Sequence, residues 1–253
     1  MEEHIGIIGA MIEEIENFKE GMSDISESNK AGITFYQGKM NDQFVVLCQS
    51  GVGKVNAAVC TQILIDNFQV TKVIFTGVAG GLAPDLEIGD IVISTAAKQH
   101  DIDASALGFP KGTIPFAIKS EFKANEELVN LAVRASMEIN QGKTVTGLIL
   151  SGDQFIAGGN SSKELFEQFG GYCTEMEGAA VAQACDMNNV PFVIVRSMSD
   201  KADGSAHTNF SEFTRLASKN SYQIVDKMLE MLSELVQLKL NIEESDGDST
   251  PPD

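Results

Sequence analysis

Short apolar runs that end in glycine recur along the chain, and stretches with helical spacing separate them. The first run, at residues 4–9, is followed by Ile12, Ile15 and Phe18 between acidic residues. Short apolar runs are typical of buried strands, whereas apolar residues three or four positions apart indicate a helix with one buried face. The N-terminal segment therefore predicts a strand followed by a helix.

The same alternation continues along the rest of the chain. Apolar runs predict further strands at 32–38, 44–49, 73–76, 90–94, 144–150 and 190–195. Helical spacing predicts helices at 55–64, 128–135, 177–187 and 213–235. Strands that alternate with helices over a whole chain are typical of an α/β fold with a mostly parallel or mixed sheet.

The interior of the chain contains no linker rich in Pro, Ser or Gly, which predicts one domain over residues 1–240. Residues 97–115 are broken by glycine and proline and predict a long loop, a feature that is often functional. Residues 241–253 hold five acidic residues and no basic one, and we expect them to form a disordered tail.

The charge balance excludes several classes of partner. The chain has 18 Lys and Arg against 36 Asp and Glu, a net charge of −18 with His neutral. Such a surface repels nucleic-acid phosphates and anionic membranes, so we expect neither as a partner. The start of the chain, Met1-Glu2-Glu3-His4, lacks the basic and apolar character of a secretory signal, which favours a cytoplasmic protein.

Metal and nucleotide motifs are weak. The three histidines have no ligand spacing, and the four cysteines form no C-x-x-C motif, which predicts reduced and partly buried thiols. The segment His100-Asp101-Ile102-Asp103 could hold a cation, but we favour a solvated polar loop. Gly53-Lys54 resembles the end of a phosphate-binding loop, yet Cys48 and Val55 stand where that loop needs Gly and Ser or Thr.

The ends of the predicted strands carry the strongest candidates for a site. Ligands of parallel α/β sheets bind beyond the carboxyl ends of the strands. Glu14, Asp153 and Asp200 follow three predicted strands, and glycine-rich segments follow two others. Glu175 and Glu177 precede a predicted helix, where acids either complement the helix dipole or meet the hydroxyls of a ligand. The segment alone favours the dipole interpretation.

Taken together, six segments resemble the nucleosidase/nucleoside phosphorylase superfamily, and more closely its 5′-methylthioadenosine/S-adenosylhomocysteine nucleosidases. They are IGIIGAM at 5–11, SGVGKVNAA at 50–58, TGVAGGL at 76–82, SGDQFI at 151–156, EMEGAAVA at 175–182 and VPFVIVRSMSD at 190–200. The resemblance implies a three-layer αβα sandwich with a central mixed β-sheet, a homodimer and no cofactor. It implies hydrolysis of the N-glycosidic bond of methylthioadenosine, S-adenosylhomocysteine and 5′-deoxyadenosine, in methionine salvage.

The resemblance also implies residue roles. Glu14 would activate the attacking water, Asp200 would act as the acid at adenine N7, and Glu177 would bind the ribose hydroxyls. Further substrate-binding positions would be Met11, Val52, Val78, Ala79, Gly80, Phe155, Ile156, Glu175, Met176, Arg196, Ser199 and Phe210. Three loop residues, Ala104, Leu107 and Phe109, would close the 5′ pocket of the partner subunit.

Two departures from the family pattern and two alternatives remain open. Val78 stands where the enterobacterial sequences have a serine that helps to hold the water. In the loop, Ala104, Leu107 and Phe109 stand where the family often has Val, Phe and Tyr. A purine nucleoside phosphorylase is the first alternative, but Glu13 and Glu14 would repel phosphate. A nucleoside-binding protein without catalysis is the second, because a fold alone does not establish an activity.

Overall fold

The computed structural model describes residues 3–139, 142–200 and 206–247, and within these ranges ten strands form one mixed sheet. The strands are β1 (His4–Gly9), β2 (Ser23–Lys30), β3 (Ile33–Met40), β4 (Gln43–Gln49), β5 (Lys72–Gly81), β6 (Ile91–Gln99), β7 (Glu121–Lys123), β8 (Thr144–Ser151), β9 (Cys173–Glu175) and β10 (Phe192–Asp200). The helices are α1 (Ile12–Gly21), α2 (Lys54–Phe68), α3 (Glu126–Ile139), α4 (Gly159–Phe169), α5 (Gly178–Asn188) and α6 (Ala206–Gly247).

The sheet curls until half of it closes on itself. Strands β4, β1, β5 and β10 run parallel to one another, in that order. Strand β10 also pairs antiparallel with β6, and β6 connects back to β5 through β8 and β9. The five strands β5, β10, β6, β8 and β9 therefore form a ring, while β3 and β2 extend the open side.

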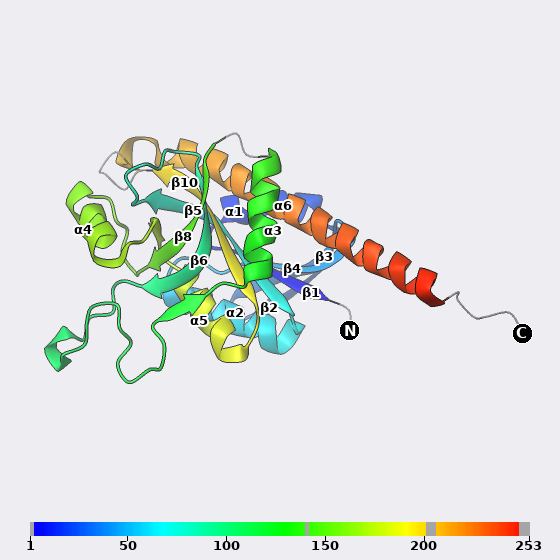
Figure 1. Cartoon of the computed structure of the whole chain (residues 1–253), viewed down its shortest axis with the longest axis horizontal. Coiled ribbons are helices and arrows are strands. Elements are labelled where there is room, and N and C mark those ends of the chain that lie inside the picture. Colours follow the sequence, from blue (N-terminus) through cyan, green and yellow to red (C-terminus); the bar gives the residue numbers. More distant parts are fainter. Residues whose placement is uncertain (1–2, 140–141, 201–205, 248–253) are drawn as a thin grey trace, which may run out of the picture.

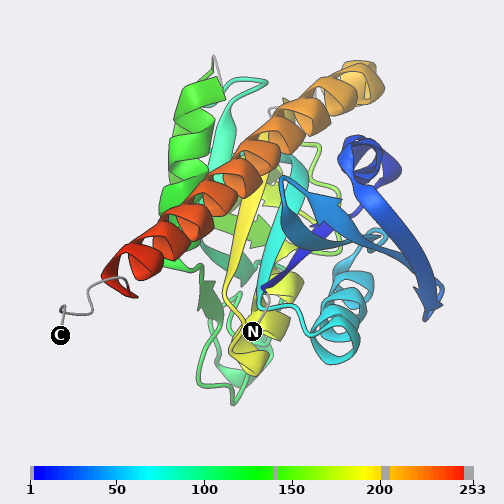
Figure 2. The ribbon, with the colours of Figure 1, turned by 90° about the vertical axis from the view of Figure 1, so that its right-hand side faces the viewer.

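Both faces of the sheet are apolar and covered, which explains why the central strands appear as continuous apolar runs. Successive side chains alternate between two cores: Ile7 and Ile74 pack with α1, α3 and α6, whereas Ile8 and Phe75 pack with α2 and α5. In Figures 1 and 2 the long helix α6 crosses one face and α2 and α5 lie on the other. This arrangement confirms the predicted three-layer α/β fold with a central mixed sheet.

Several elements were not predicted. Strand β2 has the sequence SDISESNK and is mostly exposed, so it carries no apolar signal; it forms the sheet edge through backbone pairing with β3. Polar edge strands of this kind discourage pairing with other chains. The short strands β7 and β9 and helix α4 were also missed, because three residues are too few to show a period and α4 has few apolar residues.

Some predicted boundaries were wrong. Strand β5 continues through the glycine-rich segment to Gly81, since pairing with β10 and β9 supplies backbone hydrogen bonds there. Helix α6 runs to Gly247, so residues 241–247 are helical and not the beginning of the disordered tail that we expected. Residues 248–253 of that tail lie outside the described residues.

Two further observations concern composition. The four cysteines are free and fully buried, in agreement with the expected reduced thiols but more deeply placed than expected. In the described part of the chain, every helix is too short or too polar to cross a membrane.

Candidate active site

A pocket lies at the carboxyl ends of the parallel strands, where the fold predicts a ligand site. Its described lining comes from the ends of β1, β4, β5, β8, β9 and β10 and from the start of α1. The lining residues are Ala10, Met11, Glu14, Val52, Val78, Ala79, Gly80, Gln154, Phe155, Ile156, Thr174, Glu175, Met176, Glu177, Ser199 and Asp200.

Most of the predicted site residues therefore gather around one pocket. Arg196 is not part of the lining and lies behind it, fully buried. The side chain of Phe210 lies outside the described residues, although its backbone belongs to α6. The predicted partner-pocket residues line no part of this pocket; they are Ala104, Leu107 and Phe109.

Three lining residues were missed by the sequence analysis: Ala10, Gln154 and Thr174. Ala10 and Gln154 lie within the segments IGIIGAM and SGDQFI that carry the resemblance, so these segments were the available signal. Thr174 belongs to β9, a strand of three residues that gave no recognisable pattern.

Glu14 is a buried carboxylate held by backbone amides. It lies in the first turn of α1, where its Oε2 accepts hydrogen bonds from the N–H groups of Ala10 (2.6 Å) and Met11 (2.9 Å). Its Oε1 accepts a hydrogen bond from the N–H of Val78 on β5 (3.0 Å). Burial raises the pKa of Glu14, although Arg196 and the three amides oppose the shift. The carboxylate is thus fixed in direction and made more basic than an exposed glutamate.

A glycine separates Glu14 from Arg196. A Cβ atom on Gly77 would clash with both Oε1 of Glu14 and Nη1 of Arg196. Since both atoms approach the same point beside β5, only a residue without a side chain lets them share this space. The arrangement brings an acid and a guanidinium close to each other at the back of the pocket.

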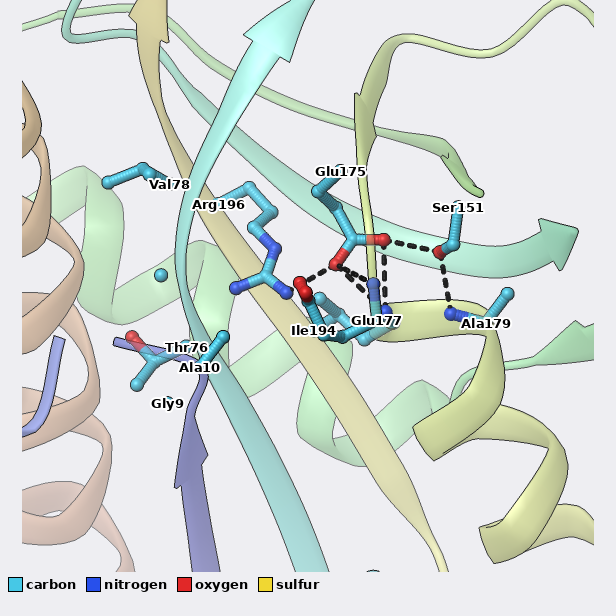
Figure 3. A network of polar contacts seen from close by, with 12 residues as sticks. Gly9, Ala10, Thr76, Val78, Ser151, Glu175, Glu177, Ala179, Ile194 and Arg196 are labelled. Atoms are coloured by element: carbon cyan, nitrogen blue, oxygen red, sulfur yellow. Dashed lines mark hydrogen bonds and ion pairs between the residues drawn. The ribbon is translucent and has the colours of Figure 1, made fainter. Parts of the chain in front are cut away.

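Glu175 and Arg196 form a buried ion pair, with Nη2 of Arg196 2.6 Å from Oε2 of Glu175. Glu175 also accepts a hydrogen bond from the hydroxyl of Ser151, as Figure 3 shows. The N–H of Gly178 donates to both carboxylate oxygens of Glu175 (2.8 and 2.9 Å). The guanidinium carbon of Arg196 lies 3.9 Å from the centre of the Phe75 ring. Its Nε and Nη1 atoms are buried with no hydrogen-bond partner in the described structure. Arg196 is therefore anchored by Glu175 and keeps two buried donors without a described partner behind the pocket.

Glu177 occupies the N-cap position of α5 and is 5% exposed. Its Oε1 accepts a hydrogen bond from the N–H of Gly53, at the start of α2 (2.7 Å). Burial, with a contribution from the nearby Glu175, raises the pKa of Glu177 to about 8, although Gly53 and Arg196 oppose the shift. The dipole interpretation of this residue is therefore incomplete, because the side chain lines the pocket.

Asp200 ends β10 and is 6% exposed. The hydroxyl of Ser199 donates a hydrogen bond to its Oδ2 (3.0 Å). Among the described residues, no group of three His, Cys, Asp or Glu side chains could hold a metal ion. The described lining of the pocket therefore combines carboxylic acids with apolar side chains.

Comparisons with known proteins agree with this geometry. The phosphorylase superfamily model matches residues 4–230. A 5′-methylthioadenosine/S-adenosylhomocysteine nucleosidase of Haemophilus ducreyi is 44% identical over 230 residues, which cover 90% of this chain and 98% of the relative.

Solved structures lead to the same group. The nucleosidase of Neisseria meningitidis, in complex with methylthio-immucillin-A, superimposes with a TM-score of 0.87 at 37% identity and covers 90% of this chain and 99% of its own. A futalosine hydrolase of Helicobacter pylori has a TM-score of 0.86 at 34% identity, over 90% and 98% of the two chains. The chain therefore belongs to the phosphorylase superfamily and, within it, to the 5′-methylthioadenosine/S-adenosylhomocysteine nucleosidases, which are N-ribosyl hydrolases.

Proposed function

We propose that the chain hydrolyses the N-glycosidic bond of 5′-methylthioadenosine and S-adenosylhomocysteine, and also that of 5′-deoxyadenosine. The observation that carries the proposal is the set of three acids around one pocket, Glu14, Glu177 and Asp200. The described lining of this pocket contains no Lys, Arg or His that could bind an attacking phosphate. This lining favours water over phosphate as the nucleophile and so disfavours a phosphorylase.

The reaction breaks the bond between C1′ of the ribose and N9 of adenine. Water attacks C1′ and transfers a proton to Glu14, while the electrons of the broken bond move into the adenine ring. Asp200 donates a proton to N7, so adenine leaves as a neutral base. An acid and a base on opposite sides of the sugar are what an inverting hydrolysis requires, and each contributes about 10²–10⁴-fold to the rate.

We place the water on the pocket side of Glu14, where it would donate a hydrogen bond to the carboxylate. The space beside Gly77 is filled by Oε1 of Glu14 and Nη1 of Arg196, so Arg196 would support the water through Glu14. The raised pKa of Glu14 favours proton transfer to its carboxylate. Val78 supplies its backbone N–H to Glu14 but has no hydroxyl for the water, so Glu14 and Arg196 hold the water without the serine of related enzymes.

The rest of the pocket fits a 5′-substituted nucleoside. Glu177 binds the ribose hydroxyls, and the apolar side chain of Met176 lines the sugar. Phe155 stacks on adenine, while the main chain of Ile156 reads its Watson–Crick edge. The 5′-alkylthio group occupies an apolar subsite lined by Met11 and Val52, with Ala79 and Gly80 on the sugar side. The family resemblance adds Phe210, whose side chain lies outside the described residues.

We also propose a homodimer in which the loop after β6 closes the neighbouring site. Leu107, Phe116 and Ile118 of this loop are exposed by 69%, 89% and 102%. Exposed apolar side chains in one segment usually mark an interface. Ala104, Leu107 and Phe109 of the partner subunit would then complete the 5′ subsite.

The first test is release of adenine from methylthioadenosine, with and without phosphate, by the wild type and Asp200→Asn. We expect release that does not depend on phosphate and falls at least 100-fold in the variant, because the base would leave as an anion. Release only with phosphate, giving a sugar 1-phosphate, would make the chain a phosphorylase. Release from futalosine alone would assign it instead to the substrate of the Helicobacter pylori hydrolase.

A further inference from the structure

Two motifs that have no part in the proposed chemistry meet beside the pocket. The ammonium of Lys54, at the start of α2, lies 2.6 Å from Oδ1 of Asp101, which follows β6. The two side chains are only 16% and 12% exposed. The sequence analysis favoured a solvated polar loop here, but Asp101 is largely buried and paired with a lysine of the same chain.

The ion pair is part of a closed ring of hydrogen bonds. Oδ2 of Asp101 accepts a bond from the N–H of Asp153 (2.9 Å), and Oδ1 of Asp153 accepts one from the N–H of Lys54 (2.8 Å). The ring joins three segments that are distant in the sequence: the start of α2, the end of β6 and the loop after β8. Lys54 Nζ also donates a hydrogen bond to Oε1 of Gln99 (3.0 Å), outside the ring.

Two of the three corners of the ring, Lys54 and Asp153, are one residue away from a pocket contact. Asp153 precedes Gln154, Phe155 and Ile156, which line the pocket. Gly53 precedes Lys54, and its N–H donates the bond to Glu177. The ring therefore connects two parts of the pocket. One is the loop proposed to contact adenine, and the other is the amide of Gly53, which orients the carboxylate of Glu177.

The ion pair of Lys54 and Asp101 is charged, and the neighbouring His100 is tightly packed. Although burial opposes ionisation, the bonds from Lys54 and Asp153 hold the pKa of Asp101 below its usual value. The imidazole of His100 packs so closely against Gly152 that a Cβ atom there would clash with it. Charge-assisted bonds in a partly buried site restrict a loop more strongly than neutral ones.

We propose that Lys54 and Asp101 are positioning residues that hold the 152–156 loop and the Gly53 amide ready for the nucleoside. They touch no reacting atom and act through Phe155, Ile156 and Glu177. The inference rests on the proposed function, since it assigns the base and ribose contacts to this pocket.

The kinetic test compares Asp101→Asn, Lys54→Met and the double variant. We expect KM for methylthioadenosine and the inhibition constant of adenine to rise together, by roughly tenfold, with kcat reduced less than about threefold. The double variant should be no worse than either single one, because each removes the same ring. Lys54→Arg should recover part of the loss. A fall in kcat without a change in KM or in the adenine inhibition constant would overturn the proposal.

Amide hydrogen exchange gives a readout that does not depend on activity. In Asp101→Asn, the amides of Lys54, Asp153 and the following loop should exchange faster, while those of β10 should not change. Asp85→Asn is the matched control, because it removes an exposed Lys–Asp ion pair with Lys143, outside the pocket lining and the loop after β6, and should alter neither exchange nor KM.

Unchanged exchange in the loop would overturn the proposal, as would faster exchange with unchanged KM and adenine inhibition. If the wild type released no adenine, the proposed function would fall, whereas exchange in the loop would still decide whether the ring anchors it.

Discussion

At the scale of single residues, the site is governed by an excess of buried acids over bases. Glu14, Glu175 and Glu177 surround Arg196, and Glu175 holds the guanidinium directly. With one positive charge among three carboxyls, a proton is retained, and the pKa of about 8 assigns it to Glu177 at neutral pH. In the proposed contact with a ribose hydroxyl, a protonated Glu177 would donate a hydrogen bond, whereas a carboxylate only accepts one.

The retained proton predicts how stability depends on pH. The folded carboxyl of Glu177 keeps its proton up to about pH 8, while the ordinary value of an unfolded one is 4.5. Unfolding releases this proton between those values, so the contribution of Glu177 to stability decreases as pH rises through the window. Glu177→Gln should flatten the decrease in Tm between about pH 5.5 and 8.5 by a few degrees.

The control for this measurement is Glu164→Gln, which removes an exposed carboxyl and changes the net charge equally. The measurement is Tm from thermal unfolding at several pH values, for the wild type and both variants. Identical pH slopes in the wild type and Glu177→Gln would contradict the assignment of the proton.

At the scale of elements, α6 has a packed part and a projecting part. Its side chains are buried against the sheet as far as Met231, but Leu235 and Leu238 are exposed by 44% and 60%. The superfamily match also ends near this point, at residue 230. Figure 1 shows the C-terminal part of the helix extending beyond the body of the molecule. Its outer part therefore contributes little to the core.

A chain truncated after Gln237 should accordingly keep its stability and activity. We expect Tm within about 2 °C of the full chain, because the removed residues lie beyond the buried stretch that holds α6 to the sheet. Calorimetry and adenine release measure both properties. A loss of activity above tenfold would instead assign a role in catalysis or assembly to the end of α6.

At the scale of the whole molecule, one face of the described structure exposes apolar side chains. Val55 and Val59 of α2 and Met187 of α5 are exposed by 73%, 42% and 73% and line one groove. Together with the loop after β6, they form a surface that suits a second copy of the chain, as the proposed homodimer requires.

Sedimentation or light scattering at micromolar concentration should therefore give twice the chain mass of 27.2 kDa. The double substitution Val55→Glu and Met187→Glu should yield monomers and raise KM, because the site loses the loop of the partner subunit. Leu238→Glu, on the projecting part of α6, is the control and should remain dimeric. A wild type with the mass of one chain would contradict the homodimer.

The sequence by itself determined the α/β class, the main strands and the superfamily, because these depend on local patterns. The strands predicted at 4–9 and 190–195 are buried on both faces of the sheet. A few consecutive apolar positions are therefore enough to identify them. The segments around Glu14, Glu175 and Asp200 also stood out, since each is a short string with a family resemblance. Their catalytic roles remain predictions.

Tertiary structure alone decided which distant groups meet. The pairing of β10 with both β5 and β6 closes the ring of strands, and nothing local to β10 specifies two partners. The edge strand β2 forms through backbone hydrogen bonds to β3, and its polar side chains give no indication of this pairing. Likewise, Lys54 meets Asp101 only after folding, because the energy of an ion pair depends on a separation in space that spacing along the chain does not reveal.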